Sequence, residues 1–470
     1  MNFKAIIAMS AAGAAISLFA AAPVVSNVSM TQNSRGTATI TYTLSGADAV
    51  VTLDIQTNVT GGAWASIGGE AVSPASGDVW KAVGMGSRTI KWDAATNWSN
   101  RQIPSNGIRA VVTAWALDNT PDYMVVDISA GAQPNSQRYY PSVDFLPGSE
   151  PGQKGAITNN TAYRLTELVM RKIMAKDICW TMGSTAQESQ RYPYYGRENT
   201  HQVTLTNNYY IGVFEITQSQ WALIQPARPN PSIFSKPGEC AMRPVDWVSF
   251  NEIRNNDGTS AADNASYNWP HEPNPNSFLG LLNARTGLAF ELPSEAQWEF
   301  AARAGNGVTK WGDGSAVLNN NEDANLSKLG RYLSNGGSAA VSGQYNLPDS
   351  SIAGNAGPDA GTAYAGTYRP NNWGIYDMHG NIAEWCLDYF EEQGSITTYN
   401  GCVNIDPSDG TKCLSGNAAP EDASYGPYHV VRGGGFTVNA DRCRSAYRNC
   451  KGQRLRYDVG FRVVCPVELQ

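Results

Sequence analysis

The sequence predicts two folded domains in one chain, an N-terminal all-β sandwich and a larger C-terminal domain built on long irregular loops. Between residues 24 and 130, short segments alternate apolar with small polar side chains and are separated by Gly-, Ser- and Asn-rich turns, a pattern typical of half-buried strands. The chain has 470 residues, 46 of them glycine and 25 proline. A chain of that length is too long for a single hydrophobic core, and a composition this rich in glycine and proline favours irregular loops.

Several segments of the N-terminal region read as strands. The clearest covers residues 37–44, where threonine alternates with apolar or small residues. Further strands are expected at residues 49–56, 88–92, 108–116 and 123–128. This number of short strands in a region of this length predicts an immunoglobulin-like or fibronectin-like sandwich. Such a module usually serves as a spacer or an adhesion unit.

The rest of the chain reads as a linker followed by one domain. Residues 131–160 are rich in Pro, Gly, Ser and Asn, which indicates a linker, and residues 161–470 then form the large domain. Its first element is expected to be a short helix over residues 165–174, from apolar spacing. A clearer helix begins at Ser294, because Ser294 and Gln297 form a capping box. Another, near residues 278–286, ends at a glycine.

The first 22 residues resemble a secretory signal peptide, with Lys4 before an apolar, alanine-rich stretch. An N-terminal membrane anchor is the alternative, and no stable span is expected after cleavage. We therefore expect a secreted, periplasmic or cell-surface protein. In an oxidising compartment the eight cysteines favour disulfides. Their pairing cannot be deduced, and Cys402–Cys413 is the most local choice.

Charge and histidine content exclude two classes of function. The chain has 34 Lys and Arg against 41 Asp and Glu, a net charge of −7, and no basic run stands out. A nucleic-acid partner is not expected, because phosphate neutralisation needs clustered cations. The four histidines show no zinc-site spacing.

Sequence segments in a fixed order give the C-terminal domain a family resemblance. They are residues 180–184, 198–205, 210–218, 243–250, 291–303, 371–385, 431–436, 443–448 and 460–464. Together they resemble the formylglycine-generating-enzyme-like, or sulfatase-modifying-factor, domain. The resemblance implies an irregular α+β fold with a C-type-lectin-like core. The arginines of the last segments are expected to form internal salt bridges with nearby acids.

The resemblance also implies structural calcium. Asp377, Gly380, Ile382 and Glu384 occupy the positions of one calcium site of this family, and carboxylates with backbone carbonyls are suitable hard ligands. Asn325 and Leu326 resemble part of a second calcium site. The alternative at the first site is a pair of carboxylates that caps the turn and bonds to arginines.

The family's oxidase is built on two cysteines, five residues apart, that bind Cu(I) after an Arg-Gly-Gly-Ser sequence. When the chain is aligned with that oxidase from Arg432 onward, Val438 takes the position of the first cysteine and Cys443 that of the second. Cys443 is therefore the sole catalytic candidate, and copper is not expected as a cofactor. A Cys443–Cys450 disulfide or a buried thiol is the more ordinary fate of this residue.

These observations favour a non-catalytic ligand-binding or surface-interaction protein whose ligand is a protein, a peptide or a glycan. One alternative is a formylglycine-generating-type oxidase that acts on a cysteine of a sulfatase-like protein. Another is a retroelement-diversified lectin-like binding protein. A structural surface component is a weaker alternative. The candidate ligand-binding residues are Phe436, Asn439, Asp441, Arg442, Asn449, Arg454, Arg456 and Tyr457.

Overall fold

The computed structural model describes most of the chain. The described residues are 21–34, 36–58, 62–99, 101–148, 156–185, 198–255, 271–336, 361–390, 403–404, 428–454 and 458–467. The predicted signal peptide, apart from its last two residues, lies outside this set, as do Arg456, Tyr457, Cys402 and Cys413. In the described part of the chain, no helix is long and apolar enough to cross a bilayer.

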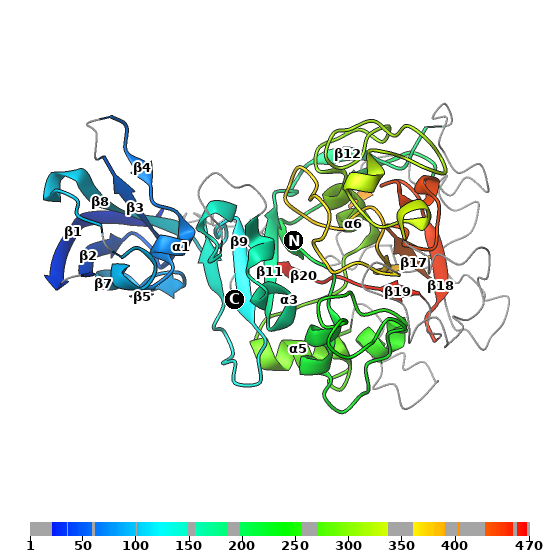
Figure 1. Cartoon of the computed structure of the whole chain (residues 1–470), viewed down its shortest axis with the longest axis horizontal. Helices are drawn as coiled ribbons and strands as arrows, with labels where there is room; N and C mark the ends of the chain where they lie inside the picture. Colours follow the sequence, from blue (N-terminus) through cyan, green and yellow to red (C-terminus); the bar gives the residue numbers. More distant parts are fainter. Residues whose placement is uncertain are drawn as a thin grey trace, which may run out of the picture.

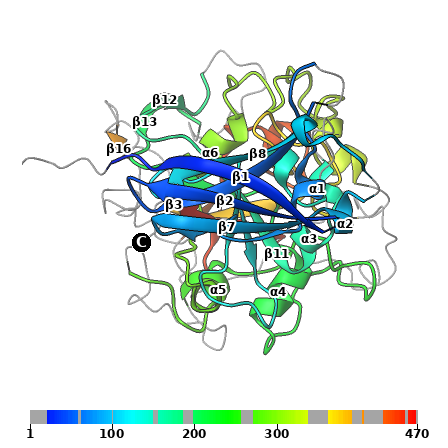
Figure 2. The ribbon, with the colours of Figure 1, turned by 90° about the vertical axis from the view of Figure 1, so that its left-hand side faces the viewer.

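The N-terminal module is a two-sheet sandwich (Figures 1 and 2). One sheet has the strand order β1-β2-β7-β5, and in the other β3 pairs with β4, β6 and β8. The buried side chains of β2 alternate with threonines that are exposed or partly exposed, because successive residues of a strand point to opposite faces. The strands are β1 (Val24–Ser34), β2 (Thr37–Ser45), β3 (Ala49–Thr57), β4 (Ala65–Ser66), β5 (Ala75–Gly77), β6 (Ala82–Val83), β7 (Gly86–Asp93) and β8 (Ile108–Ala116).

A five-stranded sheet begins the larger region, and it corrects two expectations. Its order is β10-β9-β11-β14-β20, from β10 (Arg138–Tyr140), β9 (Tyr123–Asp127), β11 (Glu167–Ile173), β14 (Tyr209–Gly212) and β20 (Val464–Pro466). The predicted strand at residues 123–128 exists, but assigning it to the sandwich was wrong. Residues 131–148 of the expected linker are also folded, since β10 pairs with β9 and Leu146 is fully buried.

The helix expected over residues 165–174 is instead a short helix, α3 (Ala162–Leu165), followed by the strand β11. Leu168 and Met170 of β11 pack in one hydrophobic cluster and Val169 in another. A central strand that is buried on both faces loses the polar alternation that would identify it.

The sandwich and the five-stranded sheet share one hydrophobic cluster. Sandwich residues such as Ile40 and Ile90 belong to the same cluster as Val169 of β11. Trp80 stacks on Tyr140 with a ring-centroid distance of 5.0 Å, and the Tyr139 N–H donates to the Trp80 carbonyl at 2.9 Å. The module is therefore packed onto the larger region and is not a separate, tethered unit.

In the described part of the larger region, two further sheets accompany α-helices and short 3-10 segments (Figure 1). The sheets have the orders β12-β13-β16 and β18-β17-β15-β19. They are formed by β12 (Cys179–Met182), β13 (His201–Thr204), β16 (Val403–Asn404), β15 (Ala383–Tyr389), β17 (Tyr428–Arg432), β18 (Asn449–Gly452) and β19 (Val459–Gly460). The larger helices are α4 (Gln218–Ile224), α5 (Phe278–Thr286) and α6 (Glu295–Arg303). The short helices α1 (Gly69–Val72) and α2 (Ala94–Asn97) belong to the sandwich.

Both helix ends predicted from sequence are confirmed. The Ser294 side chain accepts from the Gln297 N–H, and the Gln297 side chain returns to the Ser294 N–H, which completes the capping box. Helix α5 ends at Gly287, which has a φ of 70°. Only glycine adopts this left-handed conformation without steric cost.

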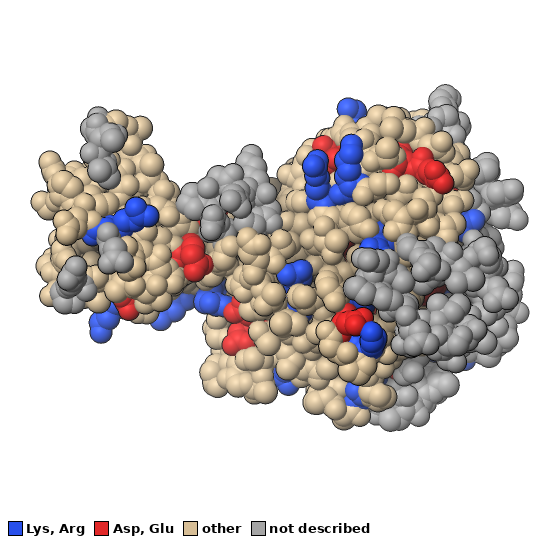
Figure 3. Space-filling view, in the orientation of Figure 1, with Lys and Arg blue, Asp and Glu red and all other residues tan. Residues whose placement is uncertain are grey.

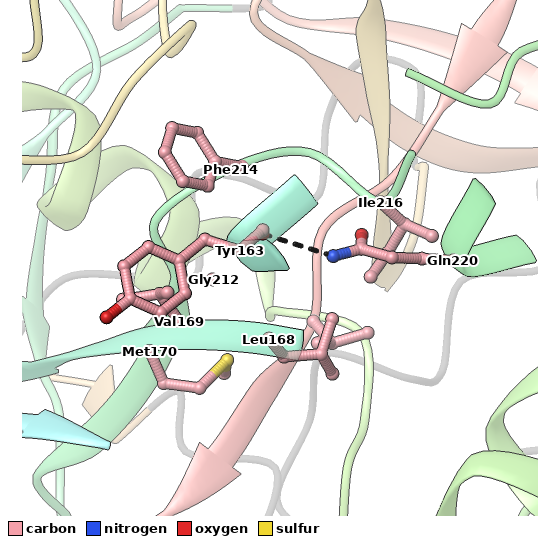
Figure 4. A pocket seen from close by; sticks show the side chains of 9 residues that line it. Tyr163, Leu168, Val169, Met170, Gly212, Phe214, Ile216 and Gln220 are labelled. Carbon is pink, nitrogen blue, oxygen red and sulfur yellow. Dashed lines mark hydrogen bonds between the residues drawn. The ribbon is translucent and has the colours of Figure 1, made fainter. Parts of the chain in front are cut away.

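A small cavity lies between β11, β14, α3 and α4 (Figure 4). Its volume is about 10 Å³, and its walls include Leu168, Phe214 and Ile216. The Gln220 side chain donates to the Tyr163 carbonyl at 3.3 Å across one side of it. This volume accommodates at most one water molecule, so the cavity is too small for a ligand.

Candidate functional site

The loop after β17 carries the residues that the family resemblance associates with copper. It runs from Arg432 through three glycines to Val438 and the 3-10 helix Ala440–Cys443. Gly434 has a φ of 66°, and a Cβ there would lie 2.5 Å from the Arg442 carbonyl oxygen and 2.8 Å from the Cys443 sulfur. Glycine is therefore required for the loop to fold over Cys443.

Cys443 is a buried thiol in an apolar cluster. Its exposed fraction is 0%, and Val438 packs against the same cluster, so the two aligned positions are neighbours in space. The cluster contains Trp311, Leu326, Leu329, Tyr332, Ala440 and Cys443, with no second cysteine. Burial raises the pKa of the Cys443 thiol far above its ordinary value. Cys443 carries a free thiol, so the alternative Cys443–Cys450 disulfide is not formed.

His379 supports this loop, a role that the sequence analysis missed. It is 1% exposed, and its Nε2 accepts from the Gly312 N–H at 3.0 Å. Nδ1 therefore carries the proton and donates to the Cys443 carbonyl oxygen at 2.9 Å. Burial lowers the pKa of His379, so the ring is neutral and structural. His379 lies in the Met-His-Gly-Asn segment that contributes to the family resemblance. No sequence pattern, however, indicated that its ring bonds to the Cys443 carbonyl.

The candidate calcium ligands at the first site are only partly suited to a metal. Arg462 holds both oxygens of Glu384, at 2.6 and 2.7 Å, and the Trp298 indole N–H donates to one of them at 2.8 Å. Asp377 accepts from the Gly366 N–H with one oxygen, while its other oxygen has no hydrogen-bond partner.

Burial is the largest cause that raises the pKa of Asp377, to about 6. Gly380 and Ile382 lie in the same tight turn, where the φ of Gly380 is 103°. Among the described residues, no group of three or more His, Cys, Asp or Glu side chains could hold a metal ion. Because Arg462 holds both of its oxygens, Glu384 fits the alternative from sequence, a carboxylate bonded to arginine.

The second candidate calcium site is a loop organised by a carboxylate. The oxygens of Asp323 accept from the N–H groups of Leu318, Asn319, Asn325 and Leu326, at 2.6 to 3.2 Å. The Asn325 side-chain oxygen accepts from the Lys328 ammonium at 3.2 Å, and the Leu326 carbonyl accepts from the Leu329 N–H at 2.8 Å. Asp323 thus organises this loop through hydrogen bonds from the loop's own backbone, and calcium here stays a prediction.

The candidate ligand-binding residues fall into separate groups. Phe436 is only 5% exposed and packs on Phe234. Asn439, Asp441 and Arg442 are partly exposed around the 3-10 helix, where the Asn439 amide donates to Asn321 at 3.1 Å. Asn449 lies opposite Val431 in the β17–β18 pairing, and Arg454 follows β18. Arg456 and Tyr457 lie outside the described residues.

Four arginines form internal ion pairs, as the sequence predicted; three of them, Arg432, Arg444 and Arg462, are buried, and Arg448 is partly exposed. Arg432 pairs with Glu299, Arg444 with Glu198, Arg448 with Glu295 and Arg462 with Glu384. The partners Glu198 and Glu295 were not anticipated. On the outer surface, by contrast, acidic and basic side chains are scattered over a largely uncharged face (Figure 3).

Residues 170–467 match the family model described as the sulfatase-modifying factor enzyme 1-like domain. The chain is 30% identical over 198 residues to the chaperone protein LppX of Paenibacillus barcinonensis, which covers 40% of this chain and 64% of that protein. It is 29% identical over 164 residues to the formylglycine-generating enzyme of Thermomonospora curvata, 34% of this chain and 43% of the enzyme. The chain thus spans less than two thirds of either relative.

Two known structures resemble the chain at low identity. Treponema denticola variable protein 1 is 24% identical with a TM-score of 0.43, over 64% of this chain and 96% of that one. PvdO from Pseudomonas aeruginosa is 22% identical with a TM-score of 0.41, over 64% of this chain and 94% of that one.

Proposed function

The chain belongs to the sulfatase-modifying factor enzyme 1-like domain family, and from this premise we propose that it is a binding protein without oxidase activity. The observation that carries the proposal is the environment of Cys443. The thiol is fully buried in an apolar cluster, and the neighbouring position holds Val438 in place of a second cysteine.

Copper does not fit this cluster. A Cu(I) ion is held by soft thiolate ligands, and a valine side chain offers no electron pair to a metal. The thiolate form of Cys443 is also disfavoured, since burial raises the pKa of its thiol. The residues around Cys443 therefore support a packing role for this side chain and give no support to oxygen chemistry.

A binding role agrees with the partly exposed loops around Asn439 and Arg442. One relative is named a chaperone protein, a name for a protein that acts on other proteins. We propose a protein or peptide ligand on these loops and an exported protein. Fractionation of cells that express the full chain, with blotting of each fraction, tests the location.

The test of the missing activity is a Cu(I) titration of the fully reduced protein, combined with oxygen uptake in the presence of a cysteine-containing peptide. The wild-type protein should show neither stoichiometric Cu(I) binding nor uptake. Cys443→Ser serves as the thiol-free control at this position. Val438→Cys should introduce stoichiometric Cu(I) binding, because it places a second sulfur in the cluster that contains Cys443. Turnover by the wild type that Cys443→Ser abolishes would refute the proposal.

Calcium at the Asp377 turn stays a prediction. It rests on two buried carboxylate oxygens without a hydrogen-bond partner, one on Asp377 and one on Glu215. Calorimetric titration of EDTA-treated protein with calcium chloride tests it. Binding should disappear in Asp377→Asn, and an unchanged isotherm in that variant would remove this turn as the site.

A further inference from the structure

A buried lysine lies beside the junction between the sandwich and the five-stranded sheet. Lys172 belongs to β11, and only 4% of it is exposed. Its Nζ atom contacts the segment that leaves the sandwich after β8 and enters the sheet as β9, the neighbour of β11 (Figure 1). Lysine is rarely buried, because its charged form is costly to remove from water. A lysine in such a place can carry chemistry that needs a neutral amine.

The side-chain amide of Asn119 lies next to this amine. The Lys172 nitrogen is 3.0 Å from the side-chain oxygen of Asn119, and it also contacts the Thr120 carbonyl oxygen. The Asn119 N–H donates to the Ala116 carbonyl at 3.0 Å, which holds the residue in a turn. The amide carbon of Asn119 is one C=O bond beyond the contacted oxygen. A small side-chain rotation therefore brings this carbon to the distance at which the amine can attack it.

The surroundings of Lys172 increase the fraction of its neutral form. Burial, the largest cause, lowers the pKa of Lys172; the charge of Arg171 lowers it further, while Asp122 acts in the opposite direction. Asp122 lies 3.9 Å from the lysine nitrogen but 2.8 Å from Arg171, so its charge is balanced mainly by the arginine. The Trp115 ring lies 6.0 Å from Nζ. Only the neutral amine has the electron pair that attacks a carbonyl carbon.

Asp122 and the solvent supply the remaining requirements of such a reaction. The Asp122 side chain is 39% exposed, so a small rotation brings its carboxylate to hydrogen-bond distance of the lysine nitrogen. A carboxylate there can accept a proton from the amine and pass it to the leaving nitrogen. Asn119 is exposed, so a leaving group released from its amide enters the solvent directly.

We propose that Lys172 and Asn119 form an intramolecular isopeptide bond. The Nζ electron pair attacks the side-chain amide carbon of Asn119, a new C–N bond forms, and the bond from that carbon to Nδ2 breaks. Nδ2 leaves as ammonia, with the proton that Asp122 transfers from Nζ. One amine and one primary amide thus become one secondary amide and ammonia, and no oxidant, reductant or further reactant is needed.

The bond ties β11 to the segment that connects it with the sandwich. It closes a loop between residues 53 positions apart, and a covalent cross-link of this kind restricts the unfolded chain. The chain contains a matched pair for comparison. Lys328 donates to the Asn325 side-chain oxygen at 3.2 Å, but Lys328 is exposed. This second pair should stay unlinked, because its amine is in water and lacks the buried surroundings of Lys172.

The test is the mass of the purified full chain, with its N-terminus determined, and of its tryptic peptides. The wild type should be lighter than its sequence by one molecule of ammonia, and the peptides that contain Lys172 and Asn119 should be joined. Asn119→Ala and Lys172→Met should each have the full mass and separate peptides. Asp122→Asn should leave a larger unlinked fraction, because the transfer of the proton then lacks its carboxylate.

A full-length mass equal to that of the sequence, also after incubation at mildly alkaline pH, overturns the inference. Loss of ammonia without joined peptides overturns it too, since a cyclised Asn119 would give that result. A link that persists in Asn119→Ala, or one through Lys328, has the same consequence. Should Lys172→Met fail to fold, Asn119→Ala decides, because it changes an exposed side chain. These measurements use neither copper nor a ligand, so they are independent of the proposed function.

Discussion

Replacing Glu384 by glutamine tests a fully buried ion pair of the C-terminal domain. Both side chains of the Glu384–Arg462 pair are 0% exposed. Glutamine retains the shape and one acceptor, so the Trp298 N–H keeps its partner, but the Arg462 charge loses its bidentate counter-ion. Breaking a buried pair by removing one charge costs about 3 to 5 kcal/mol, because the remaining charge stays buried.

The expected value lies at the low end of that range. Glu215 and Asp377 also attract Arg462. Burial is the largest cause that raises the pKa of both carboxyls, and the charge of Glu384 adds to it. Removal of that charge lets these two acids ionise more readily and compensate part of the loss. We therefore expect the free energy of unfolding to fall by about 3 kcal/mol.

Equilibrium denaturation in urea, followed by tryptophan fluorescence, measures this change. Glu239→Gln is the matched control, because Glu239 pairs with Lys236 at a similar 2.7 Å but on the surface, with 33% and 47% of the two side chains exposed. The control should lose less than about 1 kcal/mol. Equal losses in the two variants would refute the role assigned to burial. A loss that appears only with added calcium would instead make Glu384 a metal ligand.

Three further changes have definite expected results. Ser294→Ala should lower the unfolding free energy by about 1 kcal/mol in the same assay, since it removes the cap of α6; no change would show that the cap contributes nothing. Gly434→Ala should lower the unfolding free energy by about 2 kcal/mol or more, because φ is positive there and the added Cβ would clash with the backbone. Gly131→Ala, with no atom within 4 Å of the added Cβ, should leave that free energy nearly unchanged. The pKa of Asp246 is about 7 in the folded state and near the ordinary value of about 4 in the unfolded state. Between these two pH values the folded protein therefore keeps a proton that the unfolded protein has released. Wild-type stability should therefore fall relative to Asp246→Asn as the pH rises from about 4 through 7, and a difference independent of pH would contradict this.

Local chemistry explains which elements were predictable from sequence. The Ser294 cap and the Gly287 stop depend on residues at most four positions away, so the sequence contains the whole interaction. The strand at 108–116 was also predictable, because β-branched and aromatic residues are frequent in it. Strand β11 was predicted wrongly because it is largely buried on both faces, and the spacing of its apolar residues also fits a helix.

The long-range contacts of the candidate site could not be predicted from local sequence patterns. Glu198 and Arg444 are 246 positions apart, and no local pattern joins them. The alignment did place Val438 beside Cys443, since both lie in one short loop. The unpartnered oxygen of Asp246 could not be anticipated, because it depends on which donors are missing after folding.

The packing of the sandwich on the five-stranded sheet has a mechanical consequence. The Trp80–Tyr140 stack and the shared apolar cluster cross the junction between the sandwich and the sheet. The sandwich therefore cannot rotate relative to the five-stranded sheet without exposing these rings and the apolar cluster to water. The sandwich lies at one end of the molecule and β17 and β18 lie at the other (Figure 1). A molecule or surface that binds the sandwich therefore also fixes the direction in which the loops beyond β17 face a partner.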